Sequence, residues 1–272
     1  MPASESRNIL QVPGAALLSL LEYVGGLAIL AGQTLRWMLK GLFTRKTRFG
    51  WPSLAQQCVR VGVRSLGIVC LVQLFIGVIL ALQLTPPLAV WGQEAAVSRI
   101  IGLGGFRMLG PILTAVVLSG FAGASIAAEL GTMVVSEEIE AMEAGALNPI
   151  RFLVVPRVVA TLVMTVLLCV VADLMIAVGG FLTSLALGPA SYVGYWQRMQ
   201  EQLTFRDFAT GLAMAGVFGL LVGLIACHEG LKVKGGAEGV GRATTMTVVL
   251  SMVAIIASAC VFTVVFFTMG WY

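Results

Sequence analysis

The sequence predicts an all-α polytopic membrane protein, and three observations lead to this fold class. Of the 272 residues, 58% are hydrophobic and only 11% are charged, whereas a soluble domain carries about 25% charged residues. The mean hydropathy is +0.97. Apolar runs of about 20 residues recur along the chain, and each is long enough to cross a bilayer as a helix. Such a chain cannot cover a core with polar surface, so lipid must be its solvent.

Five apolar runs are predicted to span the membrane, within a single domain that covers residues 1–272. Their limits are set where charged residues, prolines and turn residues interrupt the apolar sequence; the Pro86–Pro87 pair, for example, is expected to end the first span. The predicted spans are residues 65–84, 108–128, 158–187, 208–227 and 246–269.

The segment over residues 14–43 is predicted to lie in the membrane interface. Glu22 and Gln33 interrupt its apolar sequence, and Trp37 and a cluster of basic residues follow. Length alone does not separate a spanning helix from an interfacial one, so both interpretations stay open. Residues 1–13 are polar and are expected to be loose, without the basic region or the cleavage site of a removable signal peptide.

The distribution of lysine and arginine predicts the orientation. The N-terminal region (with Arg60 and Arg64 just ahead of the first span), the segment between the second and third spans, and the loop over residues 228–245 together hold thirteen of these residues. The opposite loops hold four. Because positively charged loops stay in the cytoplasm, these three regions are predicted to be cytoplasmic and the C-terminus to lie outside.

Five of the thirteen acidic residues fall within fifteen residues, from Glu129 to Glu143. Residues 132–147 are therefore predicted to form a short cytoplasmic helix between the second and third spans. Glutamates spaced by three share a broad face, and the apolar side chains between them can contact a soluble partner. The alternative is a solvated turn whose charges merely keep it out of the bilayer. The candidate contact residues are Glu137, Glu138, Glu140, Met142 and Glu143.

Asp173 lies in the middle of the third predicted span. An ionised carboxylate at that depth costs about 3 kcal/mol on insertion scales, so its side chain is expected to face the bundle interior or a wet cavity. Proton coupling is one interpretation. A structural aspartate, bonded to groups of a neighbouring span, is favoured because the spans offer no second ionisable residue that could relay a proton.

The loop over residues 228–245 mimics the spacing of a nucleotide-binding P-loop, but its chemistry does not fit. Arg242 replaces the lysine, and Ala243 replaces the Ser or Thr that binds Mg²⁺. We therefore predict no nucleotide site in this chain. Lys232, Lys234 and Arg242 could meet anionic headgroups, and an ordinary positively charged cytoplasmic loop explains them equally well.

Small residues recur at every fourth position along the fourth span, a pattern that lets helices approach closely. The row could serve a dimer interface or only packing within the chain. Its members are Gly211, Ala215, Gly219 and Gly223.

An enzyme must also be considered. Ser125 and the single histidine, His228, both lie near cytoplasmic span ends, and such a pair could in principle cleave a peptide or an ester as an intramembrane serine hydrolase. A serine that packs at a tight helix contact is the favoured interpretation. An ion channel is disfavoured because the spans lack an evident filter or ring of acids. The five cysteines show no C-x-x-C pair, and no cofactor, metal site or nucleic-acid partner is predicted.

Three separated stretches carry a family resemblance. Residues 109–157 read LGPILTAVVLSGFAGASIAAELGTMVVSEEIEAMEAGALNPIRFLVVPR, residues 172–181 read ADLMIAVGGF, and residues 235–249 read GGAEGVGRATTMTVV. In order and in spacing they resemble the MlaE/YrbE permease family, the membrane subunits of ABC-type lipid transporters that work with MCE-domain proteins.

The resemblance implies a homodimeric permease in the bacterial inner membrane, with five spans and an N-terminal interfacial helix. It implies that the helix between spans two and three docks in a groove of a separate ABC ATPase. The cargo would be phospholipid or a similar apolar lipid, moved between the inner membrane and the outer envelope. Phe121 and Met108 stand where the family often has Arg and Glu, which implies a less polar cavity than in relatives.

Overall fold

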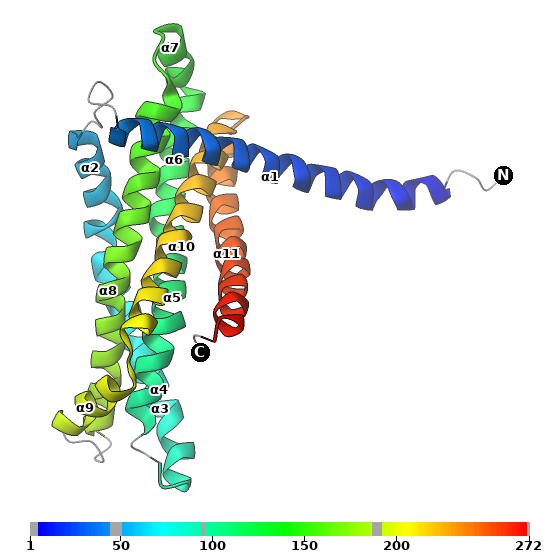
Figure 1. Cartoon of the computed structure of the whole chain (residues 1–272). Helices are drawn as coiled ribbons and strands as arrows, with labels where there is room; N and C mark the ends of the chain where they lie inside the picture. The colour runs from blue at the N-terminus through cyan, green and yellow to red at the C-terminus, as the bar shows by residue number, and fades with distance from the viewer. Residues whose placement is uncertain (1–4, 44–50, 94–95, 187–191, 271–272) are drawn as a thin grey trace.

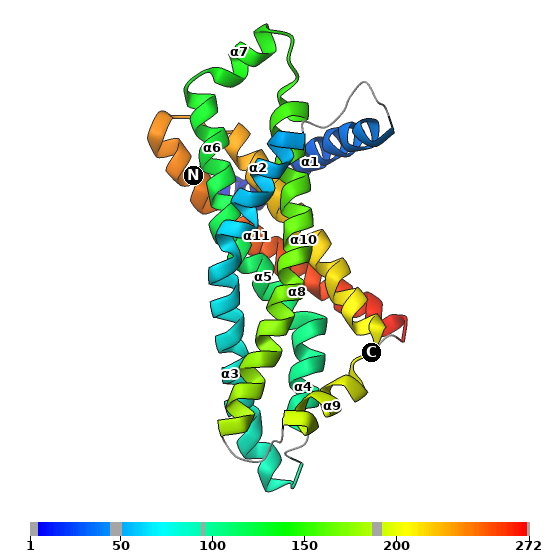
Figure 2. The same cartoon turned by 90° about the vertical axis from the view of Figure 1, so that its left-hand side faces the viewer.

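The computed structural model describes residues 5–43, 51–93, 96–186 and 192–270, and every regular element in these ranges is helical. Five helical stretches are long and apolar enough to cross a membrane, so the all-α fold with five spans is confirmed. Figures 1 and 2 show them as an elongated bundle. The stretches are Trp51–Val90, Ala96–Val135, Ile150–Ala186, Phe205–Leu231 and Gly236–Thr268.

Several of these stretches are built from consecutive helical segments. The first span contains α2 (Trp51–Val61) and α3 (Leu66–Val90), and the third contains α8 (Val155–Ala186). The fourth and fifth are α10 (Phe205–Leu231) and α11 (Gly236–Thr268). The second span comprises α4 (Ala96–Gly104), a π-helical turn (Gly105–Leu109), α5 (Gly110–Leu118), a second π-helical turn (Ser119–Gly123) and α6 (Ala124–Val135).

The first span does not end at residue 84 as predicted. Helix α3 continues through Pro86 and Pro87 to Val90. A proline removes a hydrogen bond to the carbonyl four residues before it. Near a helix end the carbonyls that lose their partners can be satisfied by water, so two prolines are tolerated there.

Helix α8 lies at the centre of the bundle and packs against α3, α5 and α10. Its contact with α3 is close because glycines face backbone. A Cβ built on Gly77 would lie 2.1 Å from the carbonyl oxygen of Ile176, and one on Gly179 would lie 2.2 Å from that of Leu74. Backbone-to-backbone approach of this kind is how apolar helices associate without a hydrophobic driving force between them.

Helix α1 (Glu5–Phe43) is a single 39-residue helix, so residues 5–13 are helical and not loose as expected. It lies crosswise to the spans, at the end of the bundle that carries the α10–α11 turn (Figure 1). Its C-terminal half contacts α10 and the start of the third span. That α1 lies in the membrane interface stays a prediction.

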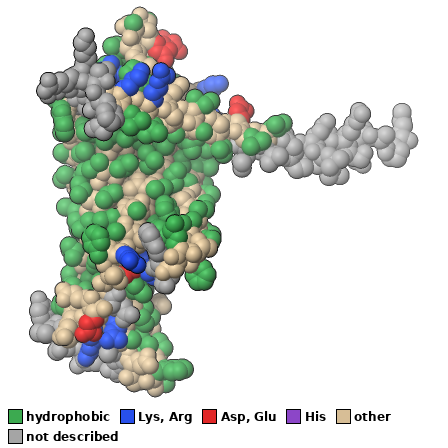
Figure 3. All heavy atoms as spheres, in the orientation of Figure 1, with side chains coloured by type: hydrophobic (Ala, Val, Ile, Leu, Met, Phe, Trp, Pro, Cys, Tyr) green, Lys and Arg blue, Asp and Glu red, His purple; other side chains and the backbone are tan. Residues whose placement is uncertain are grey.

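The two ends of the bundle carry different elements. Helix α7 (Glu138–Ala144) and α1 lie at one end, and α9 (Tyr192–Gln202) and the C-terminal end of α3 lie at the other (Figure 1). The regions that were predicted to share the cytoplasmic side therefore share one end of the molecule. On the face in Figure 3, hydrophobic side chains form a belt and charged side chains gather above and below it.

Candidate functional site

Helix α7 projects from the end of the bundle (Figures 1 and 2) and carries the acidic side chains that were expected to meet a partner. The helix expected over residues 132–147 is shorter, because residues 132–135 belong to α6 and α7 spans Glu138–Ala144. Glu137 precedes α7 with a left-handed backbone (φ 59°), so of the glutamates spaced by three only Glu140 and Glu143 lie on the helix. These acids are exposed, whereas Met142 is half-buried.

A network of one carboxylate and two guanidinium groups ties three elements together near the same end. Glu129 on α6 forms one ion pair with Arg60 on α2 and a second, at 3.1 Å, with Arg157 on α8. Arg157 is 4% exposed and also donates to the carbonyl oxygen of Leu153 at 2.9 Å. A buried guanidinium is costly unless it is paired, so Glu129 makes the burial of Arg157 possible.

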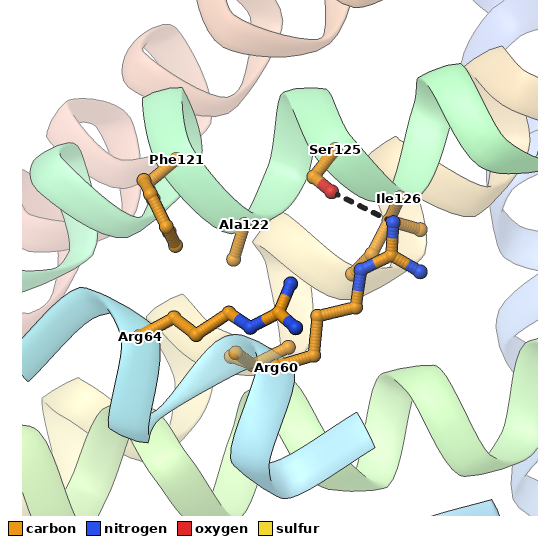
Figure 4. Close-up of a pocket in the computed structure, with 7 residues that line it drawn as sticks. Arg60, Arg64, Phe121, Ala122, Ser125 and Ile126 are labelled. Atoms are coloured by element: carbon orange, nitrogen blue, oxygen red, sulfur yellow. Dashed lines mark hydrogen bonds between the residues drawn. The ribbon is translucent and has the colours of Figure 1, made fainter. Parts of the chain in front are cut away.

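A pocket of about 80 Å³ opens beside this network, between α2 and the second span (Figure 4). A neighbouring groove of about 420 Å³ shares its two arginines. Arg60 donates to the hydroxyl oxygen of Ser125 at 3.2 Å, and Arg64 extends into the same space beneath Phe121. The pocket is lined by Arg60, Val61, Arg64, Phe121, Ala122, Ser125 and Ile126; we call it the Arg60–Arg64 pocket.

Two expectations change at this pocket. Ser125, which was expected at a tight helix contact, lines the pocket and is bonded to Arg60 of α2. Phe121 lines it as well, and the pocket is nevertheless basic, because Arg60 and Arg64 enter from α2 and the turn that follows it. Sequence reasoning placed both arginines ahead of the first span but did not pair them with anything. The sequence offers only one signal, the spacing of two arginines four residues apart, which places them on one face of a helix; it does not show which residue of another span they meet.

In the described structure no hydrogen bond joins Ser125 and His228. The Ser125 hydroxyl accepts from Arg60, whereas the His228 ring packs edge-on against Tyr23 of α1 at 5.1 Å between centroids. The His228 Nε2 atom has no hydrogen-bond partner among the described residues. Lys232 lies 5.6 Å over the ring of Tyr23, and burial and the nearby Glu229 carboxylate raise the pKa of the Tyr23 phenol. His228 therefore helps to dock α1 on the bundle.

Asp173 is buried between the second and third spans. Its Oδ1 atom faces Gly110, where a Cβ would lie 1.9 Å away, and has no hydrogen-bond partner in the described part of the chain. The Cys169 thiol approaches Oδ2 at 3.9 Å. Gln73 on α3 donates to Thr114 at 3.2 Å nearby. The side chain thus faces the interior of the bundle.

A second buried ion pair lies at the opposite end of the bundle. Arg107, in the first π-helical turn, contacts Asp207 of α10 at 2.7 Å. Asp207 also accepts from the backbone N–H of Thr204 at 3.0 Å and completes a capping box at the start of α10. Because one carboxylate closes the helix terminus and holds the neighbouring span, this pair has a structural explanation. Sequence reasoning did not single out Asp207.

The basic loop residues lie together. Lys232, Lys234 and Arg242 line a pocket of about 130 Å³ with Glu229. Glu229 offsets part of their charge. Gly235 and Gly236 turn the chain between α10 and α11 with φ of 89° and 70°, a conformation that side chains rarely adopt.

The row of small residues on α10 packs within the chain. A Cβ on Gly211 would lie 2.1 Å from the carbonyl oxygen of Phe106, and one on Gly223 would lie 2.2 Å from the hydroxyl of Thr161. Gly219 faces Thr165, and Ala215 is fully buried. The row therefore brings α10 close to α8 and to the second span.

Known proteins share this sequence over most of its length. Residues 54–265 match the family described as "Permease MlaE". A "Probable ABC transporter permease protein" of Rickettsia felis is 35% identical over 79% of this chain and 83% of its own length. A protein of the same description from Synechocystis is 32% identical over 84% of this chain and 85% of its own.

A plant protein is also similar. The Arabidopsis thaliana protein TRIGALACTOSYLDIACYLGLYCEROL 1, chloroplastic, is 31% identical over 88% of this chain and 67% of its own length. The family match covers the pocket and nearly all of the five spans, and the two bacterial relatives are named as probable ABC transporter permeases. With its five spans, the chain is a multi-pass membrane protein that belongs to the MlaE family of ABC transporter permeases.

Proposed function

We propose that this permease moves phospholipid, or a similar apolar lipid, between the bacterial inner membrane and the outer envelope. The observation that carries the proposal is membership of the MlaE family along residues 54–265. The name of the Arabidopsis relative refers to a diacylglycerol glycolipid, which supports a lipid cargo. The spans of this chain fit such a cargo, because acyl chains bind to apolar surface and need no hydrogen-bonding side chains.

An ABC permease works with an ATPase, and α7 is the proposed contact. The helix is held at both ends by spans and presents exposed acids beside half-buried Ile139 and Met142. A displacement of α7 by the ATPase would be transmitted to α6 and to the third span, because α7 is joined to both. We place this end of the bundle in the cytoplasm, because the basic regions of the chain gather there.

We further propose that the permease is a homodimer and that an MCE-domain protein receives or delivers the lipid on the far side. Helix α11 supports the dimer, because its outer face exposes large apolar side chains from Met246 to Phe267. They include Val253, Ile256, Val261, Val264 and Phe267. Two such faces can enclose an apolar cavity between protomers.

The test is purification from mild detergent, followed by mass spectrometry of the bound proteins and lipids and by measurement of the particle mass. We expect an ABC ATPase, an MCE-domain protein, bound phospholipid and two copies of this chain. Recovery of the ATPase without any lipid, together with a water-soluble cargo, would refute the lipid proposal while leaving the family assignment intact.

A further inference from the structure

The charges around the Arg60–Arg64 pocket do not balance. Arg60, Arg64 and Arg157 bring three guanidinium groups to this part of the bundle, and the described ion pairs of Arg60 and Arg157 both use the same carboxylate, Glu129. Guanidinium groups stay charged at any physiological pH. The neighbourhood therefore carries an excess of positive charge that one glutamate does not neutralise.

Arg64 is the group that holds this excess. Its side chain is exposed and makes no ion pair or hydrogen bond with any described residue. It is also surrounded by apolar, outward-facing side chains of the same span, since Val63 is 60% exposed and Val59 and Leu66 are exposed as well. An arginine at the edge of an apolar belt reaches for water or for a lipid headgroup.

The pocket offers the donors that a phosphate group needs. Arg60 is held in place by Glu129, so its guanidinium is oriented before any ligand arrives. The Ser125 oxygen accepts from Arg60, which leaves the Ser125 hydroxyl proton free to donate. Arg64 extends into the same space (Figure 4). Planar guanidinium groups match the geometry of phosphate oxygens and form short, charge-assisted hydrogen bonds with them.

We infer that the Arg60–Arg64 pocket binds the phosphate of an anionic phospholipid from the cytoplasmic leaflet. The unneutralised charge favours a headgroup without a compensating amine, such as phosphatidylglycerol. The pocket opens beside a groove of about 420 Å³ that is lined by Ala55, Gln56, Val59 and the two arginines. The ligand is a lipid and not free phosphate because the outward side chains next to this groove, Val59, Val63 and Leu66, are apolar and exposed, so acyl chains have a surface to lie on. The inference rests on the proposed lipid-transport function and names the class of lipid and the place where it is held.

The experiment measures equilibrium binding of a fluorescent phosphatidylglycerol to the purified full-length protein in detergent. Arg64→Gln should lower the affinity about tenfold, because it removes a charge-assisted contact. Arg64→Lys should retain part of the affinity. The matched control is Arg36→Gln, an exposed arginine of α1 outside the pocket, which should change the affinity less than about twofold. Arg64 is exposed, so its variants should fold.

Four competitors identify the source of the phosphate. Unlabelled phosphatidylglycerol should displace the probe best, phosphatidylcholine less well, and diacylglycerol with the same chains least. Inorganic phosphate should not displace it. The inference fails if Arg64→Gln and Arg36→Gln behave alike, or if diacylglycerol competes as well as phosphatidylglycerol. Displacement by inorganic phosphate alone would make the pocket a site for a soluble anion and would refute the lipid.

A transport assay with the ATPase separates this inference from the proposed function. If the wild-type protein moves lipid but Arg64→Gln binds phosphatidylglycerol normally, the pocket assignment is wrong and the function stands. If the wild-type protein binds phosphatidylglycerol through Arg64 but moves no lipid, the function is wrong and the site stands.

Discussion

Single residues decide how charge is tolerated in this bundle. Glu129 is the clearest case, since it accepts from α2 and from α8 while it sits on α6. It joins three spans that the sequence separates widely; Arg60 and Glu129 alone are 69 residues apart. Without this carboxylate, Arg157 would be a buried and uncompensated charge.

Glu129→Ala should therefore destabilise the protein by about 2 kcal/mol, less than for a fully buried pair because Glu129 and Arg60 are partly exposed to solvent. The measurement is thermal unfolding of the purified protein in detergent. Arg99→Ala is the matched control, because Arg99 and Glu201 form an exposed ion pair at 3.3 Å and should contribute less than about 1 kcal/mol. Equal effects of the two variants would contradict the role of the network.

For Asp173, another single residue, we expect that loss of the charge has little effect. Its described contacts are a distant thiol and a glycine, and no basic residue is among them. An amide has the same shape and avoids the cost of a buried charge. Asp173→Asn should thus preserve both thermal stability and lipid transport. A folded Asp173→Asn protein that has lost transport would instead favour proton coupling.

At the scale of elements, the spans meet through glycines that face backbone. Helix α3 offers an internal comparison, because Gly77 contacts α8 whereas Gly67 has no atom within 4 Å of a built Cβ. Gly77→Ala should lower the unfolding free energy by about 1–3 kcal/mol through overpacking. Gly67→Ala should be neutral or slightly stabilising. Thermal unfolding of the two variants checks this, and similar losses would mean that the α3–α8 contact can relax.

Charge reversal on and beside helix α7 should affect assembly with the ATPase and leave folding unchanged. Reversal of Glu137, Glu140 and Glu143 to Lys should weaken binding of the ATPase, because like-charge contacts in an interface cost several kcal/mol. The three side chains are exposed, so expression and particle mass should not change. Co-purification of the ATPase is the measurement. Full recovery of the ATPase, with normal lipid transport, would move the coupling contact to the loop over residues 228–245.

The five membrane spans could be predicted from the sequence, because their signal is local. Runs of apolar residues report spans whatever their neighbours are, so all five were found. The Arg60–Arg64 pocket and the Arg107–Asp207 pair depend on which spans touch, which hydropathy does not encode. The length of α7 was misjudged because α6 continues to Val135 and a left-handed residue, Glu137, then interrupts the helix.

The orientation of the whole molecule can be measured directly. In a background without the five native cysteines, Ser136→Cys and Leu18→Cys should react with an impermeant thiol reagent only from the cytoplasmic side, since α7 and α1 share one end of the bundle. Trp91→Cys lies at the other end and should react only from outside. Labelling of Leu18→Cys from outside would show that α1 crosses the membrane.

The length and placement of α1 also constrain how the protomer can move. At 39 residues the helix is about 58 Å long, and it joins the bundle through one half only. If the axis of α1 tilted by about 20° from the membrane plane, its two ends would differ in depth by about 20 Å. This difference is more than half of the thickness of a hydrocarbon core of about 30 Å. If α1 lies in the membrane interface as predicted, it therefore opposes tilting of the protomer along its axis. The protomer can still rotate about the long axis of α1, but a rotation that pushes one end of α1 into the bilayer is opposed.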